Sequence, residues 1–238
     1  DIFGEEEPYK GGHYFPCRYP NATYAAMITC LDDQVGELIA KLKEEGVYDN
    51  TLIVFTSDNG PTYAGGADTG FFNSGGIFDE SYGRGKGFTY EGGIRVPMVA
   101  QWPGRIAPGT ESDHISAFWD VMPTLCDIAG ADTPAETDGI SFLPALKGRT
   151  NREHEFLYWE FPEYQGQQAV RIGRWKGIRK NILKGNMRVE LYDLELDPRE
   201  TNDLAKDYPS VVEKIKMIMT REHTKSELKR FQIRQLGD

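Results

Sequence analysis

The chain has few of the features that mark several large protein classes. It contains three cysteines in 238 residues, none of them in a Cys-x-x-Cys pair, which argues against a disulfide framework and a cysteine-rich zinc site. No apolar run approaches the roughly 18 residues that a membrane-spanning helix needs. Basic residues number 27 against 37 acidic ones, for a net charge of −10. We therefore expect neither a nucleic-acid partner nor binding to an anionic membrane.

What the chain does have is the composition of a globular protein. Hydrophobic residues make up 39% of it and aromatic residues 12%, which is enough for a core. The opening residues, Asp1 to Glu7, do not resemble a signal peptide. Cys30 and Cys126 lie in apolar contexts with helical spacing, and we predict that both are small core residues.

Apolar periodicity divides the first part of the chain into helices and strands. Residues 22–45 carry apolar side chains at helical spacing and are followed by Gly46, so we predict a helix that packs one face on a sheet. Residues 51–57 and 96–101 are typical of strands, and 116–129 of a helix that Gly130 ends. The intervening loop of residues 60–93 is too long for a simple connection, which favours a functional role.

After residue 148 the pattern changes to short β-like runs. They cover residues 156–161, 168–172, 175–179 and 189–192, with Gly173 at a predicted turn. We expect an antiparallel sheet of three or four strands, covered on one face by a terminal helix over residues 208–223. The sequence therefore predicts two domains, residues 1–148 and residues 149–238.

The first candidate site follows the strand of residues 51–57. Thr51-Leu-Ile-Val-Phe-Thr-Ser-Asp-Asn-Gly60-Pro61 is an apolar run, expected to be buried on both faces, that ends on an acid, an amide and a turn. In open α/β sheets the carboxyl ends of strands open onto the ligand crevice. Asp58 and Asn59 would offer hard oxygen ligands to a divalent cation. An ordinary Asp-Asn-Gly turn is the alternative.

The second candidate site is Gly83-Arg-Gly-Lys86-Gly-Phe-Thr-Tyr90-Glu91-Gly-Gly-Ile-Arg95. Its glycines can take positive φ and bring the backbone and the Lys86 ammonium close to an anion. Arg84 is a candidate for a second anion contact. We predict that Glu91 and Arg95 hold this loop in place as a charged pair or a hydrogen-bonded turn. The alternative is a flexible glycine loop with a solvated lysine.

With three further segments, the chain resembles the sulfatase family, in its arylsulfatase-like branch of the alkaline phosphatase superfamily. The segments are Tyr24-Ala-Ala-Met-Ile-Thr-Cys-Leu-Asp-Asp-Gln-Val-Gly36, Ser116-Ala-Phe-Trp-Asp120-Val-Met-Pro123 and Leu191-Tyr-Asp-Leu-Glu-Leu-Asp197-Pro-Arg-Glu200. The resemblance implies the α/β class: part of an alkaline-phosphatase-like α/β sandwich, then a small α+β subdomain. It implies that Asp58 and Asn59 bind a divalent cation, usually Ca2+, and that Lys86 is a catalytic residue contacting the sulfate. It does not fix the role of Arg84.

One expected motif is absent. Sulfatases attack the ester with a formylglycine made from Cys/Ser-x-Pro-x-Arg, but Cys17 precedes Arg18-Tyr-Pro20, which places proline one position late. No other cysteine or serine fits, and the family's paired aspartates and leaving-group histidines are not visible. We therefore interpret the chain as the carboxyl-terminal portion of a sulfatase, inactive alone. Its expected partners are an aryl or carbohydrate sulfate ester and the amino-terminal half of the same protein. The resemblance is compatible with export.

Two other functions stay open. The same cation and lysine would suit a phosphate or phosphonate monoester hydrolase, and the chain could instead be a non-catalytic binding module. His114 and His154 are expected to pack or hydrogen-bond, whereas His13 is the only histidine we would place in an outer pocket. Asp120 is expected to hold nearby backbone or His114. The aromatic run of residues 158–161 is expected in the sheet core, with a ring-binding pocket as the alternative.

Overall fold

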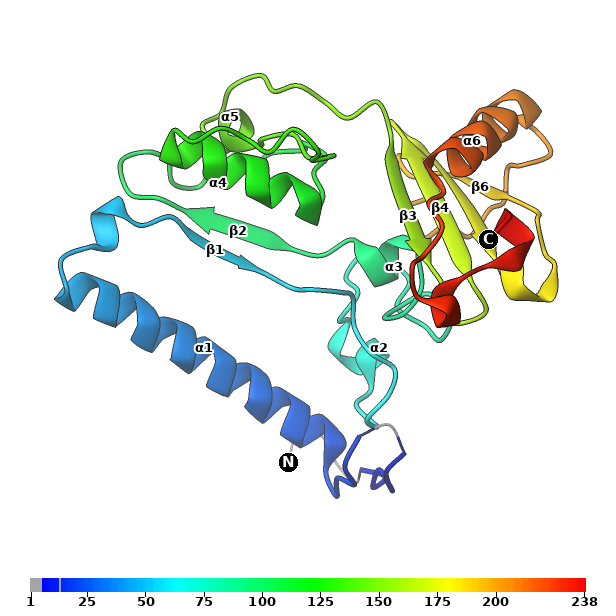
Figure 1. The fold of residues 1–238 in the computed structure, drawn as a ribbon. Coiled ribbons are helices and arrows are strands. Elements are labelled where there is room, and N and C mark those ends of the chain that lie inside the picture. Colours follow the sequence, from blue (N-terminus) through cyan, green and yellow to red (C-terminus); the bar gives the residue numbers. More distant parts are fainter. Residues whose placement is uncertain (1–5, 13) are drawn as a thin grey trace. The chain divides into compact units, whose positions relative to one another are not determined.

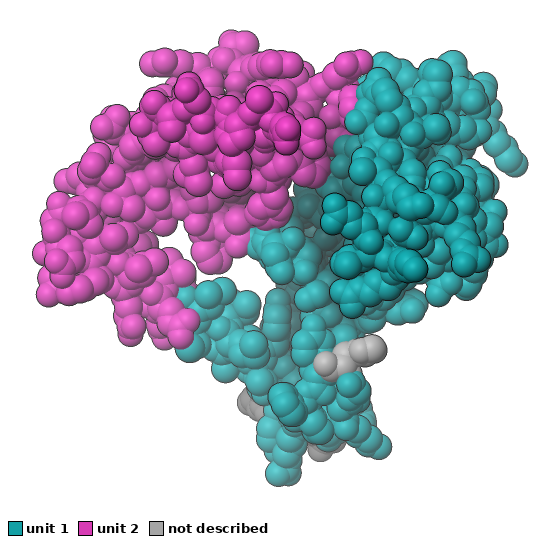
Figure 2. Space-filling view, in the orientation of Figure 1, with its two compact units in different colours: residues 1–31, 57–97, 158–238 teal, residues 32–56, 98–157 magenta. Residues whose placement is uncertain are grey.

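The computed structural model describes residues 6–12 and 14–238 and shows a mixed α/β protein. The described chain forms two compact units (Figure 2). Unit 1 combines Asp1–Leu31, Ser57–Pro97 and Tyr158–Asp238, and unit 2 combines Asp32–Thr56 and Met98–Leu157. This grouping is discontinuous in sequence, and the predicted domain division at residue 148 stays a prediction.

Unit 1 is built on a four-stranded sheet in the order β3-β4-β5-β6 (Figure 1). Its strands are β3 (Leu157–Phe161), β4 (Gln167–Ile172), β5 (Trp175–Lys180) and β6 (Glu190–Asp193). Both β4–β5 and β5–β6 are antiparallel, and Gly173, with φ of +53°, turns the chain between β4 and β5. The predicted sheet is confirmed.

The two faces of β5 are covered by different elements, because successive side chains point to opposite faces. On one face lies α6 (Pro209–Glu222), whose Ile215 packs so closely that a Cβ on Gly177 would lie 2.6 Å from its Cγ2. Val212, Ile215 and Met219 are buried, as predicted for this helix. On the other face, Ile178 belongs to a buried cluster with Tyr90, next to α3 (Glu91–Ile94).

Short helical segments complete unit 1. They are α2 (Thr69–Phe72), which the Asp68 side chain caps by accepting a hydrogen bond from the Phe71 N–H, and the 3-10 turns η3 (Ile182–Lys184), η4 (Lys229–Phe231) and η5 (Arg234–Leu236). Both α2 and α3 lie within the predicted functional loop of residues 60–93, or at its end.

Unit 2 holds a two-stranded antiparallel sheet of β1 (Ile53–Thr56) and β2 (Met98–Gln101), in which Ile53 pairs with Gln101. It also holds η1 (Tyr48–Asn50), η2 (Phe118–Asp120), α4 (Val121–Ala129) and α5 (Leu143–Leu146). Both predicted strands and the predicted helix are confirmed. The expected burial of the first strand on both faces is wrong, because Val54 and Phe55 are each 44% exposed and no third strand flanks this sheet among the described residues.

The first helix, α1 (Pro20–Glu44), begins in unit 1 and continues into unit 2. It ends at Glu44, shortly before the predicted stop at Gly46, whose φ is +70°. Its expected packing on a sheet is wrong for the described chain, since Ile28, Leu31 and Leu38 are 49%, 43% and 59% exposed. Cys30 is likewise exposed rather than part of a core, because it lies on this uncovered helix. None of the described helices combines the length and the apolar character needed to cross a bilayer.

Asp120 is the polar centre of unit 2. Its buried carboxylate accepts the backbone N–H groups of Ala117 at 2.7 Å and Ile140 at 2.8 Å, which confirms the predicted backbone role. The predicted alternative partner, His114, is wrong: the histidine that reaches Asp120 is His154, with Nε2 2.8 Å from Oδ1. His114 Nε2 instead lies 3.0 Å from Asn151 Nδ2. His13 lies outside the described residues.

Candidate functional site

The turn after β1 exposes two oxygen donors. Asp58 is exposed, and within the described part of the chain its carboxylate has no ion-pair partner. Ser57 Oγ donates to the Asn59 carbonyl at 2.9 Å, and Asn59 Nδ2 donates to the Gly60 carbonyl at 3.0 Å. The second bond uses the nitrogen end of the Asn59 amide, so the oxygen end can serve a ligand. The turn can therefore present a carboxylate and an amide oxygen together.

The lysine loop is fixed directly against this turn. The Lys86 backbone N–H donates to the Pro61 carbonyl at 2.9 Å, and the Gly60 N–H donates to the Gly93 carbonyl at 2.9 Å. Glycine is required at the contact, because a Cβ on Gly60 would lie 1.8 Å from the Gly92 carbonyl oxygen. Two segments that the sequence singled out separately are thus joined through their backbones inside unit 1.

Lys86 is partly buried, and among the residues that the structure describes it has no carboxylate within ion-pair distance. A lysine ammonium without an ion-pair partner, a carboxylate and an amide oxygen are the kinds of group that an anion and a hard cation bound together would use. No group of three or more His, Cys, Asp or Glu side chains in the described residues could hold a metal ion. Asp58 and Asn59 therefore fit a hard cation only as part of a larger ligand set.

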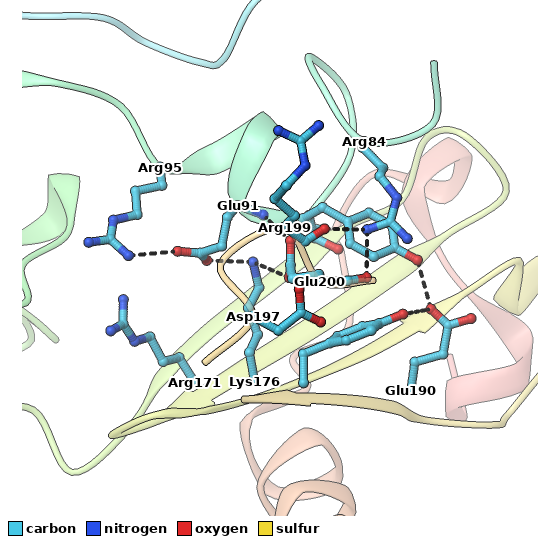
Figure 3. A network of polar contacts seen from close by, with 12 residues as sticks. Arg84, Glu91, Arg95, Arg171, Lys176, Glu190, Asp197, Arg199 and Glu200 are labelled. Atoms are coloured by element: carbon cyan, nitrogen blue, oxygen red, sulfur yellow. Dashed lines mark hydrogen bonds and ion pairs between the residues drawn. The ribbon is translucent and has the colours of Figure 1, made fainter. Parts of the chain in front are cut away.

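Arg84, the other predicted anion contact, is held by protein groups. Its Nη1 donates to the carbonyls of Arg199 at 3.1 Å and Glu200 at 2.9 Å, and its Nε lies 3.4 Å from Asp79 Oδ2. The guanidinium also lies 4.3 Å from the ring centroid of Tyr90. These contacts tie the lysine loop to the turn after β6 (Figure 3). A contact of Arg84 with the substrate stays a prediction.

A buried network of charged side chains lies at the start of α3 and holds the end of the lysine loop (Figure 3). Lys176 Nζ lies 2.7 Å from Glu91 Oε1 and 3.2 Å from Glu200 Oε1, and all three side chains are at most 3% exposed. The Glu91 backbone N–H, at the start of α3, donates to Glu200 Oε2 at 2.6 Å. Arg95 Nη1 lies 3.3 Å from Glu91 Oε2. The predicted structural role of Glu91 and Arg95 is confirmed, whereas Lys176 and Glu200 were not predicted as its partners.

The two buried acids of this network differ in proton affinity. Burial acts to raise the pKa of Glu91, but the charge and hydrogen bond of Lys176, with Arg171 and Arg95 nearby, leave that pKa below its ordinary value. For Glu200, burial dominates and the neighbouring Glu91 charge adds to it, so its pKa is raised despite Lys176. Glu200 Oε1 lies within ion-pair distance of Lys176 but makes no hydrogen bond. Glu91 is therefore the better-paired anion.

Comparison with known proteins decides the family. Residues 8–131 match the model of the family described as Sulfatase, and residues 77–227 match that described as N-sulphoglucosamine sulphohydrolase, C-terminal. The chain belongs to the sulfatase family. The resemblance inferred from its motifs is confirmed, and with it membership of the alkaline phosphatase superfamily.

Individual relatives agree with this assignment. The chain is 33% identical to arylsulfatase A of Homo sapiens over 240 residues, which cover 89% of this chain and 45% of that protein. The crystal structure of Ps i-CgsB is similar with a TM-score of 0.70 at 29% identity, covering 85% of this chain and 43% of that one. The structure of a phosphonate monoester hydrolase of Agrobacterium radiobacter is similar with a TM-score of 0.61 at 26% identity. The match covers 83% of this chain and 40% of that one. The sulfatase chain thus spans less than half the length of these proteins.

Proposed function

We propose that the complete protein is a sulfuric ester hydrolase and that this chain carries part of its cation and sulfate site. The observation that carries the proposal is the hydrogen bond from the Lys86 N–H to the Pro61 carbonyl. It fixes the Lys86 backbone against the segment that follows the Asp58–Asn59 turn in a member of the sulfatase family. The roles of Asp58, Asn59 and Lys86 are inferred from this arrangement and from the family's motif.

The chemistry follows from the charge of the substrate. A sulfate monoester repels a nucleophile until its oxygens are neutralised, and Lys86 would donate to one of them and orient the group for attack. Asp58 and Asn59 would supply two oxygen ligands to a divalent cation, Ca2+ by family resemblance. When bound, that cation would add positive charge beside the ester oxygens. Arg84 would act mainly by fixing the loop through its carbonyl contacts.

We infer that a formylglycine nucleophile comes from residues other than these 238, since no Cys/Ser-x-Pro-x-Arg motif occurs among them. We infer that the chain alone does not turn over substrate and that its partner is the preceding half of the same protein. Turnover by the pure chain would refute this inference. Sequencing upstream of Asp1 offers an independent check, because a formylglycine motif is expected there.

The role of Lys86 is tested by Lys86→Ala in the complete protein. We expect kcat/KM for a sulfate ester to fall by at least about tenfold, which corresponds to about 1.4 kcal/mol of barrier. Lys206→Ala is the matched control, because Lys206 is an exposed lysine of the same unit, and it should leave the rate unchanged. A loss smaller than about tenfold for Lys86→Ala would show that the ammonium does not serve the reaction.

A phosphonate monoester hydrolase is the second candidate, favoured by the likeness to the Agrobacterium radiobacter enzyme. The same ammonium and cation would accept a phosphoryl group. Measuring kcat/KM of the complete protein on phenyl sulfate and on a phenyl phosphonate monoester separates the two reactions. Binding of Ca2+ and sulfate without turnover of either ester would instead indicate a non-catalytic binding module.

A further inference from the structure

His223 lies between two carboxylates that come from different parts of unit 1. It is the C-cap of α6. Its Nδ1 lies 2.9 Å from Glu160 Oε2 of β3, and its Nε2 lies 3.0 Å from Asp238 Oδ1. The side chains of His223, Glu160 and Asp238 are 12%, 20% and 2% exposed. All three belong to unit 1, so this ion-paired cluster lies within one compact body.

Only the protonated form of His223 satisfies both contacts. A neutral imidazole has one N–H donor and one lone pair, whereas the imidazolium has two donors. Glu160 Oε2 already accepts a hydrogen bond from the Tyr158 hydroxyl. Asp238 Oδ2 accepts the Ile233 N–H at 2.6 Å. Both carboxylates therefore act as acceptors, and a neutral His223 would place its lone pair against one of them.

The electrostatic surroundings of His223 also favour the cation. The C-terminus of a helix carries a partial negative charge, and His223 caps that end of α6. Burial acts to lower the pKa of His223, but the hydrogen bond and charge of Glu160, followed by those of Asp238, leave that pKa above its ordinary value. Among the described residues, His223 is the only base within ion-pair distance of either carboxylate. Further groups that act on the cluster are Tyr158 of β3, Arg179 of β5 and Lys225.

Residues 224–238, which follow α6 and are drawn in red in Figure 1, pack against the loop between β3 and β4. The Ile233 side chain is fully buried, and a Cβ on Gly166 of that loop would lie 3.5 Å from Ile233 Cδ1. The backbone N–H of the same Ile233 donates to Asp238, which pairs with His223. The ion pair at His223 therefore helps to position the residue that supports the loop.

The loop between β3 and β4 leads directly to the lysine loop. Gln167, the first residue of β4, is buried, and its Oε1 accepts the Thr89 N–H at 3.1 Å. Its Nε2 donates to the Gly87 carbonyl at 2.9 Å, and Gly87 follows Lys86 in the sequence. A continuous path of contacts within unit 1 thus runs from His223 to the backbone beside Lys86.

We propose that His223 is a proton-controlled latch. As an imidazolium it fastens residues 224–238 to the sheet, and loss of its proton releases this segment and loosens the loop between β3 and β4. Because the pKa of His223 is raised, its contribution is complete below the unfolded histidine pKa of about 6.5 and is lost as pH rises through the folded value. The hydrogen bond from the Ile233 N–H lowers the pKa of Asp238, so Asp238 keeps its charge in mild acid. The latch is therefore closed in mildly acidic solution and opens in alkaline solution.

The test is hydrogen–deuterium exchange of the complete protein at about pH 5.5 and about pH 9, on either side of the ordinary histidine pKa of about 6.5. Protection factors correct for the effect of pH on intrinsic exchange, and the amides of α6 serve as the internal reference. We expect protection in residues 224–238 to fall at least about tenfold at the higher pH, the size of one charge-assisted hydrogen bond, with a smaller fall in residues 162–166. Amide exchange reports the latch whether or not the complete protein hydrolyses a sulfate ester.

Asp238→Asn distinguishes the latch from simple packing. The asparagine amide can donate to the lone pair of a neutral His223 while its oxygen still accepts the Ile233 N–H. Protection of residues 224–238 should therefore be retained in this variant, and its dependence on pH should be lost. His223→Gln should be less protected at both pH values. His114→Gln, at a histidine of unit 2, is the control and should behave as wild type.

Two results would overturn the latch. One is wild-type protection in residues 224–238 that changes by less than about twofold between the two pH values. The other is an Asp238→Asn variant that keeps the wild-type pH dependence. A fall confined to residues 224–238 would overturn their role in supporting the loop between β3 and β4. Should His223→Gln fail to fold, the wild type and Asp238→Asn still decide between these outcomes.

Discussion

Lys176 provides the sharpest test of how the site is held together, through the substitution Lys176→Met. Its ammonium is fully buried, 2.7 Å from Glu91 and 3.2 Å from Glu200. Methionine preserves the length and apolar packing of the side chain but removes the cation. The two carboxylates would then remain buried, and the nearest remaining ion-pair partner of Glu91 is Arg95, whose side chain is 47% exposed.

The loss of stability expected for Lys176→Met follows from the distance between Lys176 and Glu91. With an effective dielectric constant of about 20, a 2.7 Å contact is worth about 6 kcal/mol of Coulomb energy. The desolvation of Lys176 offsets part of that attraction, and removing one partner of a buried pair typically costs about 3–5 kcal/mol. We therefore expect the free energy of unfolding to fall by about 3–5 kcal/mol near pH 7.5, out of a total of about 5–15 kcal/mol.

The pH dependence has a definite sign. In the wild type the pKa of Glu91 is lowered, so Glu91 stabilises the fold above its unfolded pKa and loses this contribution as pH falls through its folded pKa. Without Lys176, burial would raise the folded pKa of both Glu91 and Glu200 above the unfolded values. Each would then take up a proton on folding, so the variant's penalty grows with rising pH and shrinks toward about pH 5.

Urea unfolding of the complete protein at about pH 7.5 and about pH 5 measures both effects. Lys216→Met is the matched control, because Lys216 pairs with Glu213 at 2.8 Å on the surface of α6 with both side chains exposed. That substitution should change the free energy of unfolding by at most about 0.5 kcal/mol at either pH. The reasoning would be refuted if Lys176→Met lowered the free energy of unfolding by less than about 1 kcal/mol at pH 7.5. It would also be refuted if the loss were larger at pH 5 than at pH 7.5.

Three further results are expected in the complete protein. Gly60→Ala should lower both Tm and kcat/KM, since its Cβ would lie 1.8 Å from the Gly92 carbonyl oxygen. Its control is Gly36→Ala in α1, where the added Cβ meets open space. That substitution should raise the free energy of unfolding in urea by up to about 1 kcal/mol. Asp58→Ala should raise the Ca2+ concentration needed for half-maximal rate, and an unchanged Ca2+ titration would exclude Asp58 as a ligand. Glu200→Gln should cost less than about 1 kcal/mol at pH 7.5 by urea unfolding, because the raised pKa of Glu200 shows that its charge is poorly compensated; a larger loss would show that the charge itself stabilises the fold.

The helices and strands could be predicted from the sequence because each depends on the local spacing of apolar residues. Val212, Ile215 and Met219 lie on one face of α6 and are buried there, as their spacing predicted. The same periodicity in α1 predicted burial of Ile28 and Leu38, which are exposed in the described chain. Apolar spacing shows which face of a helix favours burial, but it does not show whether the covering element belongs to the same segment.

The candidate site likewise has residues that local motifs predict and residues that only the folded structure reveals. Asp58 and Lys86 each lie in a short motif that could be recognised alone, whereas the pairing of Lys176 with Glu91 spans 85 positions in sequence and has no local signature. A lysine between a tryptophan and a glycine in a strand is ordinarily interpreted as solvent-facing. In this structure β5 is covered on one face by α6, through Ile215, and on the other by α3. The Lys176 side chain is therefore fully buried. A buried lysine requires a carboxylate partner, and the acid of the glycine-flanked Glu91 segment supplies it, which is how the terminal sheet positions the lysine loop.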